Sequence, residues 1–282
     1  MQNLFITKNL KIVREAKMLK IEGEKLRKIP VNLINGVYLF GNVELTNGAR
    51  NLLLDYSKDI YLFNSKGEFK GVVTNSKLKS NYRYRLLQYK NIDNLEIAKF
   101  IVLKKIEEIE KYTKKSLNRY KEKLKTTTNL NEVLGVEGSS SIYLFNKVRE
   151  KLNDVGIKFE KREYRPAKDR VNSVLSFVYK LHYGILHTII LNEGFDVYIG
   201  FLHKKRGTHM AFVSDVMEGY RVILTAFVVT LFINKKLSDE DFNGIYLNYE
   251  GRKKFLRYYL DLIEEMDNNS FLEEIKRKLE SF

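Results

Sequence analysis

The hydrophobic residues of this 282-residue chain change their spacing once, near residue 75. Before that point, short runs rich in β-branched and aromatic residues alternate with turn formers, a pattern that predicts β-strands. The runs are Leu4–Thr7, Leu10–Arg14, Met18–Ile21, Val37–Phe40, Ile60–Phe63 and Phe69–Val73. Apolar residues at helical spacing predict one short helix among them, at Asn47–Tyr56.

Beyond residue 90 the apolar residues recur every three or four positions, and this spacing continues to the end of the chain. The longest such stretch, Leu95–Leu124, predicts one long amphipathic helix with Asp93-Asn94 as its N-terminal cap. We expect a loop at Thr126–Asn129 and a further helix at Ile142–Leu152. Glu137 and the serines after it stand at or near the first turn of that helix, where acids and serines are typical capping residues.

These patterns predict an α+β fold in which a small N-terminal β-domain precedes a larger all-α domain. We expect the β-domain at residues 1–75, a linker at 76–90 and the helical domain at 91–282. The hydrophobic content of 44% is sufficient to build a packed core.

The charge of the chain selects a class of partner. Lys and Arg outnumber Asp and Glu by 50 to 35, which gives a net charge of +15, and both the first 80 residues and the remainder are basic. Such an excess favours polyanions such as nucleic acid or an anionic membrane surface. The longest apolar run, Val222–Ile233, has 12 residues. A membrane-spanning helix needs about 20, so we interpret the run as a buried helix and expect no membrane association.

Cysteine is absent, which excludes disulfides, thiolate zinc sites and cysteine nucleophiles. This absence fits a reducing cytoplasm, and the first residues do not have the pattern of a signal peptide. We therefore expect a cytoplasmic protein.

A polyanionic substrate without cysteine chemistry directs attention to carboxylates and histidines that could hold a divalent metal ion, because phosphodiester chemistry needs a Lewis acid. A lone histidine is more often structural, and the chain has four: His182, His187, His203 and His209. His203 differs from the others because it ends the apolar run Val197–Leu202 and precedes the basic Lys204-Lys205-Arg206. A metal-binding imidazole beside a phosphate-binding loop would have this arrangement.

An acidic pair begins twelve residues after His203. Asp215 and Glu218 are spaced i, i+3, which places both carboxylates on one face if the segment is helical. The alternative is an exposed helix face with ordinary acids. Apolar Met217 and the apolar run after Arg221 argue against full exposure of this face.

Several sequence blocks, in order along the chain, resemble those of the CRISPR-associated spacer-acquisition integrase and endonuclease family, the Cas protein numbered one. The blocks are EGSSSIYLF from Glu137, YRPAKDRVNSVLSFVYKL from Tyr164, GFDVYIGFLH from Gly194, SDVMEGYR from Ser214 and YLNYEGRKKFLRYY from Tyr246. The resemblance covers the helical region, and the β-rich start suits the N-terminal β-domain of that family.

The resemblance implies a metal-dependent nuclease and integrase that joins short double-stranded DNA fragments into a repeat array, by attack of a DNA 3′-hydroxyl on a phosphodiester. By position, Glu137, His203 and Glu218 match the catalytic metal ligands of the family. Asp215 is their acidic companion and a further candidate ligand. Two carboxylates and one imidazole suit Mg²⁺ or Mn²⁺.

Basic and aromatic residues near these ligands are candidates for contacting DNA. Phosphate contacts are expected from Arg165, Lys204, Lys205, Arg206 and Arg221. Tyr164 and Tyr183 match positions where the family has aromatic residues near DNA, and they could stack on unpaired bases; packing in a helical core is the alternative. Asn172 and Ser176 are expected to fix helix packing around the site.

The resemblance also implies the assembly: a homodimer to whose contact the β-domains contribute, bound to the small second CRISPR-associated protein. Two other functions remain open at this point. One is a stand-alone metal-dependent DNA nuclease of repair, and the other is a non-catalytic, basic nucleic-acid-binding scaffold.

Overall fold

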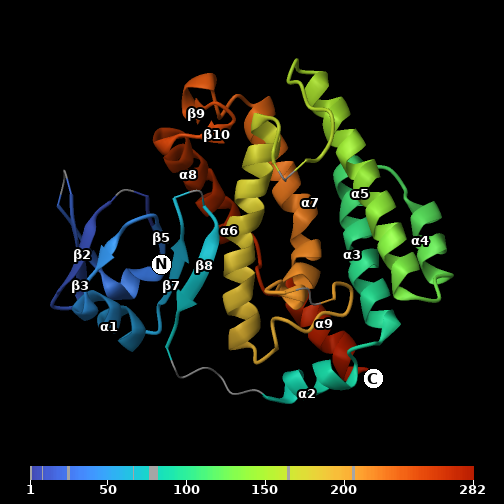
Figure 1. Cartoon of the computed structure of the whole chain (residues 1–282), viewed down its shortest axis with the longest axis horizontal. Coiled ribbons are helices and arrows are strands. Elements are labelled where there is room, and N and C mark those ends of the chain that lie inside the picture. The colour runs from blue at the N-terminus through green and yellow to red at the C-terminus, as the bar shows by residue number, and fades with distance from the viewer. Residues whose placement is uncertain are drawn as a thin grey trace. The chain divides into compact units, whose positions relative to one another are not determined.

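The fold is described from a computed structural model, for residues 2–7, 9–23, 26–65, 67–75, 82–163, 166–204 and 207–282. The chain divides into two compact units. The first consists of Met1–Leu78 with Leu256–Leu260, and the second of Lys79–Phe255 with Asp261–Phe282. The expected α+β fold class is confirmed, with strands first and helices after them (Figure 1).

In the described part of residues 2–75, the first unit has two four-stranded sheets and the helix α1. One sheet has the order β1-β5-β7-β8 and the other the order β4-β3-β2-β6. The elements are β1 (Gln2–Ile6), β2 (Lys11–Glu15), β3 (Met18–Glu22), β4 (Arg27–Pro30), the 3₁₀ turn η1 (Val31–Leu33), β5 (Ile34–Phe40), β6 (Glu44–Leu45), α1 (Asn47–Asp55), β7 (Asp59–Phe63) and β8 (Phe69–Val73). The sequence predicted every strand in this set except β4 and β6.

The first sheet is mixed. Strands β1, β5 and β7 run parallel, and β8 pairs antiparallel to β7. On one face, Tyr38 of β5 stacks between Phe5 and Tyr61 with ring centroids 4.3 and 4.4 Å apart, which ties the three parallel strands together. Aliphatic side chains of both sheets and of α1, such as Ile12 and Leu53, form the core of this unit.

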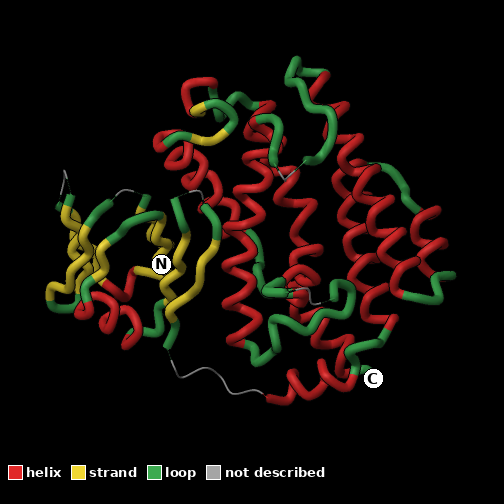
Figure 2. Tube along the Cα trace, in the orientation of Figure 1, coloured by secondary structure: helices red, strands yellow, loops and turns green. Residues whose placement is uncertain are grey.

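In its described residues, the secondary structure of the second unit is helical except for one small hairpin (Figure 2). Its elements are α2 (Tyr82–Lys90), α3 (Leu95–Thr113), α4 (Asn118–Lys125), α5 (Leu130–Asn153), α6 (Arg170–Asn192), α7 (Ala211–Ile233), the 3₁₀ turn η2 (Asp239–Asp241), β9 (Phe242–Asn243), β10 (Tyr246–Leu247), α8 (Tyr249–Glu265), of which Leu256–Leu260 belong to the first unit, and α9 (Ser270–Glu280). The central helix α7 packs against α6 and α3, and α3 packs against α5.

Four expectations for this region are wrong in detail. Residues 82–90 form helix α2 instead of part of a linker, with Gln88 buried and bonded to the 196–199 loop. The expected long helix ends at Thr113, because Lys114 adopts a left-handed conformation (φ 55°), and a new helix starts at Asn118. The β9–β10 hairpin interrupts the otherwise helical domain.

The fourth correction concerns Glu137. It lies in the middle of α5, because that helix starts seven residues earlier than Glu137, where the Asn129 side chain accepts a hydrogen bond from the Glu132 amide. Glu137 is therefore not a capping residue, and its side chain is available for tertiary contacts.

Helices α6 and α7 are each long and apolar enough to cross a membrane by length and composition. The run Val222–Ile233 is the second half of α7. In both helices 61% of the most apolar window is buried inside the structure, as expected for core helices. The expectation of no membrane association stays a prediction.

Candidate active site

The predicted ligands come from three parts of the helical unit. Glu137 lies on α5, Glu218 lies in the second turn of α7, and His203 lies in the loop between α6 and α7. Glu218 is almost completely buried, with 2% of its side chain exposed, whereas Glu137 and His203 are exposed by 19% and 26%. Glu137 and His203 are therefore the two predicted ligands that solvent reaches.

Lys105 of α3 joins the two glutamates. Its Nζ donates to Glu137 Oε1, to Glu218 Oε2 at 2.6 Å and to Ser141 Oγ at 2.7 Å, which uses all three ammonium protons. Only 2% of Lys105 is exposed. Burial works to lower the pKa of this ammonium, but the charges of Glu218 and Glu137 outweigh burial and leave the pKa raised.

Glu218 is held ionised by its neighbours. Its Oε1 accepts a hydrogen bond of 2.6 Å from Arg221 Nε, one turn further along α7. Burial alone would raise the pKa of Glu218, but the positive charges of Arg221 and Lys105 lower it to about 2. The Arg221 guanidinium also lies 5.4 Å from the centre of the Tyr179 ring, in cation–π range.

Asp215 fixes the loop that carries His203. It has no exposed surface, and its two oxygens accept hydrogen bonds from the amides of Phe201 (2.6 Å), Leu202 (3.0 Å) and His203 (2.8 Å). Its Oδ1 also lies 2.8 Å from His203 Nδ1. When the imidazole carries its proton on Nδ1, this contact orients the ring and leaves a lone pair on Nε2. These contacts fit a residue that positions His203, whereas the further role of Asp215 as a metal ligand stays a prediction.

The imidazole of His203 is electrostatically coupled to both acids of α7. Burial works to lower the pKa of His203, but the hydrogen bond and charge of Asp215, assisted by Glu218, leave it raised. The charges of Asp215 and Glu218 thus favour the protonated form of the His203 ring.

Among the described residues, no three His, Asp or Glu side chains lie close enough together to hold a metal ion. The Lys105 ammonium lies between Glu137 and Glu218, where it neutralises the two carboxylates as a bound cation would. The donors present are two carboxylates and one imidazole, a set that suits Mg²⁺ or Mn²⁺. The residues therefore fit a divalent ion by their chemistry, and the site already contains one cation.

Sequence reasoning missed Lys105. Its signal is a lysine at a core position, because Ile101 and Ile109, four residues before and after it on α3, are both fully buried. Lysine is almost never buried unless it is paired, so a lysine at this position predicts buried acidic partners.

The candidate DNA-binding residues are only partly described. Tyr164, Arg165, Lys205 and Arg206 lie outside the described residues. Lys204 is exposed and pairs with Asp93 at 3.0 Å, and the Tyr183 hydroxyl donates to the Met210 carbonyl at 2.8 Å. Arg221 bonds to Glu218 as described above. The DNA contacts of this set stay predictions.

Asn172 and Ser176 contact the chain that precedes α6. Asn172 is fully buried, and its Oδ1 accepts from Arg162 (3.0 Å) and from the Glu163 amide (2.9 Å). Ser176 Oγ accepts from Arg162 at 3.0 Å. These bonds hold the loop against α6, in line with the expected role in packing.

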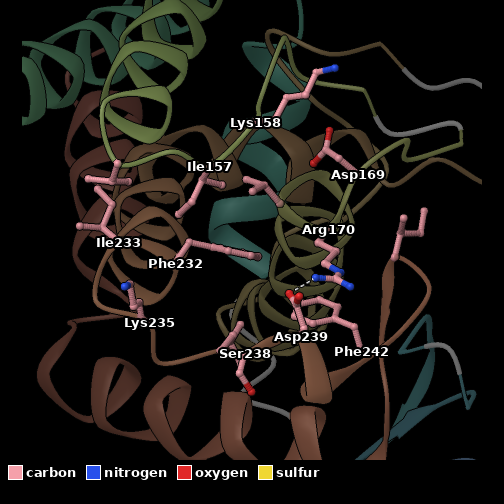
Figure 3. A pocket seen from close by; sticks show the side chains of 14 residues that line it. Ile157, Lys158, Asp169, Arg170, Phe232, Ile233, Lys235, Ser238, Asp239 and Phe242 are labelled. Carbon is pink, nitrogen blue, oxygen red and sulfur yellow. Dashed lines mark hydrogen bonds and ion pairs between the residues drawn. The ribbon is translucent and has the colours of Figure 1, made fainter.

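A cavity of about 440 Å³ lies elsewhere in this unit. It is lined mainly by apolar residues such as Ile157 and Phe232, and the Arg170–Asp239 ion pair lies at its side (Figure 3). None of the predicted catalytic residues lines it. Because the predicted catalytic residues lie outside this cavity, the carboxylate and histidine group remains the candidate active site.

Residues 4–261 match the profile of the family described as CRISPR associated protein Cas1. The CRISPR-associated endonuclease Cas1 of Thermotoga maritima is 27% identical, over 94% of this chain and 88% of its own length. A CRISPR-associated endonuclease Cas1 of Thermodesulfovibrio yellowstonii is 30% identical, over 86% of this chain and 85% of its own.

Solved structures share the fold. A Cas1 protein from Thermotoga maritima aligns with a TM-score of 0.84 at 25% identity and covers 99% of this chain and 95% of its own. A casposase bound to its integration product aligns with a TM-score of 0.77 at 19% identity, over 92% of this chain and 82% of its own. A chain of a Cas6-RT-Cas1–Cas2 complex aligns with a TM-score of 0.78 at 22% identity, over 99% of this chain and 34% of its own. At 19% and 22% identity, the likeness to the casposase and to the chain of the complex shows a shared fold alone.

Proposed function

This chain belongs to the Cas1 family of CRISPR-associated proteins, and from that premise we propose that Glu137, His203 and Glu218 bind the divalent ion with which it acts on DNA. The chain is a DNA endonuclease and integrase of CRISPR spacer acquisition. The observation that carries the assignment of the site is that Glu137 and Glu218, 81 positions apart, both bond to the ammonium of Lys105.

The reaction proposed for the site is attack of a DNA 3′-hydroxyl on a phosphodiester, with hydrolysis when water takes the place of the hydroxyl. A bound Mg²⁺ or Mn²⁺ supplies a Lewis acid that lowers the pKa of the hydroxyl and neutralises charge that develops on the phosphate. Glu218 stays ionised at neutral pH, since its pKa is lowered to about 2. Asp215 contacts Nδ1 of the His203 ring, so Nε2, on the other side of the ring, takes no part in this hydrogen bond.

Two positive side chains offset most of the negative charge that the site would present to DNA. Glu137, Asp215 and Glu218 carry three negative charges, and Lys105 and Arg221 balance two of them. With a divalent ion bound, these residues would form a site of net positive charge, which would favour a phosphate backbone. Phosphate contacts from Lys204, Lys205, Arg206, Arg165 and Arg221, and stacking by Tyr164 and Tyr183, belong to this proposal.

The proposed substrate is double-stranded DNA, and the proposed partner is the small second CRISPR-associated protein. Support comes from the net charge of +15 and from neighbours in fold whose titles describe a Cas1–Cas2 complex and a casposase bound to its integration product. A homodimer with contacts through the β-domain at residues 1–75, a cytoplasmic location and the absence of membrane association complete the proposal.

The test is a joining reaction. A labelled duplex with free 3′-hydroxyl ends is incubated with a supercoiled repeat-containing plasmid and Mn²⁺ or Mg²⁺, with and without the small partner. The variants are Glu137→Gln, His203→Ala and Glu218→Gln. Glu150→Ala is the matched control, because Glu150 lies on the same helix as Glu137 and forms an exposed ion pair with Lys147.

We expect metal-dependent joining by the wild type and by Glu150→Ala, and a loss of about 100-fold or more in each site variant. Cleavage without joining, with or without the partner, would favour a stand-alone nuclease. Unchanged nucleic-acid binding with neither activity would favour a scaffold. Joining that persists in all three site variants would refute the assignment of the site.

A further inference from the structure

The Lys105 ammonium contacts the same two carboxylates that are proposed to bind the metal ion. It contacts one oxygen of each proposed carboxylate ligand, Oε1 of Glu137 and Oε2 of Glu218. The second oxygen of Glu218 bonds to Arg221 at 2.6 Å. Both oxygens of the buried Glu218 therefore already carry a positively charged donor.

Glu137 and His203 are the two partly exposed candidate ligands, and each keeps one donor atom for an ion. No hydrogen bond from a described residue reaches Glu137 Oε2 or His203 Nε2. The other oxygen of Glu137, Oε1, and the other ring nitrogen of His203, Nδ1, are both hydrogen-bonded. These two free atoms, Oε2 and Nε2, are available to a divalent ion without displacing a protein donor. To reach Glu218 as well it must approach the ammonium closely, and two cations in a dry site repel each other strongly.

If the ammonium moves away from Glu218, it can keep its hydrogen bond to Ser141. Ser141 lies one turn after Glu137 on α5, and its hydroxyl bonds to both Lys105 Nζ and Glu137 Oε1. A small movement can thus break the contact with Glu218 without leaving the ammonium unpaired, which is the costly state for a buried charge.

We propose that Lys105 is a positioning residue that acts as a resident cation: it holds Glu137 and Glu218 together before the metal ion binds, and the ion displaces it from Glu218. This inference rests on the proposed function, since it concerns the same metal site. It means that the affinity for the ion is set by competition with an internal charge as well as by the three ligands.

The test is the affinity of the full chain for Mn²⁺ without DNA, measured by isothermal titration calorimetry and by the electron paramagnetic resonance signal of free Mn²⁺. Lys105→Gln removes the charge but keeps an amide donor for the carboxylates. Lys105→Met removes both charge and donors. Lys104→Met is the matched control, because Lys104 precedes Lys105 on α3 and pairs with Glu274 on the surface.

We expect Lys105→Gln to bind Mn²⁺ about tenfold or more tightly than the wild type, and Lys104→Met to bind it unchanged. We also expect Lys105→Gln and Lys105→Met to melt at a lower temperature than the wild type in EDTA and to gain more from Mn²⁺, because the ion then replaces the missing cation. A purely structural lysine would lower the melting temperature without tightening the metal site.

Two results overturn the inference in different ways. If the wild type binds Mn²⁺ and folded Lys105→Gln binds it equally or more weakly, Lys105 does not compete and the proposed function still stands. If neither the wild type nor folded Lys105→Gln binds Mn²⁺, the proposed metal site fails and the role of Lys105 fails with it.

Discussion

His182 makes the stability of the helical unit depend on pH in a way that can be calculated. The side chain has no exposed surface and packs against the Tyr220 ring, with ring centroids 5.0 Å apart. Burial lowers the pKa of His182 from its usual 6.5 to about 3. The native chain therefore keeps the ring neutral at pH values where the unfolded chain protonates it.

The sign and the size follow from this difference. Since the folded pKa is the lower one, stability is fully present above pH 6.5 and is lost as the pH falls toward 3. At about 1.4 kcal/mol per pKa unit, lowering the pH from 7 to 5 removes roughly 2 kcal/mol through this one group. The variant His182→Leu removes the titration while it changes the packing equally at both pH values.

Urea unfolding of wild type and His182→Leu, followed by circular dichroism in EDTA at pH 7 and pH 5, measures the effect. We expect the free energy of unfolding of the wild type to fall by about 2 kcal/mol more than that of the variant. Equal pH dependence in the two proteins would show that the ring is protonated in the native state and would refute the reasoning.

Two further predictions concern the site and its surroundings. Asp215→Asn should lower the free energy of unfolding by about 3 kcal/mol, because a fully buried carboxylate that accepts three amide bonds is lost, and it should weaken Mn²⁺ binding by freeing the His203 ring. Thermal melts in EDTA and calorimetric titration measure the two effects, and unchanged metal affinity would count against a positioning role. Lys204→Gln should weaken DNA binding nearly independently of sequence and reduce by about one the slope of log affinity against log salt. Fluorescence anisotropy at several salt concentrations measures this slope, and an unchanged slope would mean that Lys204 stays paired with Asp93 in the complex.

The sequence predicted best the features that depend on local periodicity. Alternation and turn residues located strands such as β5 and β7, and the helix at Asn47–Tyr56 was correct within one residue. Strands β4 and β6 were missed because they are short edge strands, and β4 reads Arg-Lys-Ile-Pro with a single aliphatic residue. Such strands form through pairing with a neighbour and not through a pattern of their own.

The helix break at Lys114 had no signal in the apolar spacing. Leu117 is buried even though it lies between two helices, so the pattern of threes and fours continues across the break. Its cause is local, since the Glu110 side chain accepts a hydrogen bond from the Leu117 amide and supports the turn.

The candidate site depended on residues far apart in sequence. His203 and Asp215 were singled out from local context, and the structure joins them directly. Glu137 was identified through the family resemblance, because in isolation it resembled a capping residue. Lys105 was missed because its partners are 32 and 113 positions away, and only the packing of α3 between α5 and α7 brings them together.

The most direct test of the account is the pulsed electron paramagnetic resonance spectrum of the Mn²⁺-loaded chain, which detects nitrogen bound to the ion. We expect modulation from one imidazole nitrogen in the wild type and in the surface control Glu150→Ala, and its loss in His203→Ala. Bound Mn²⁺ without nitrogen modulation in the wild type, or modulation that persists in His203→Ala, would contradict the assignment of His203 as a ligand of the site.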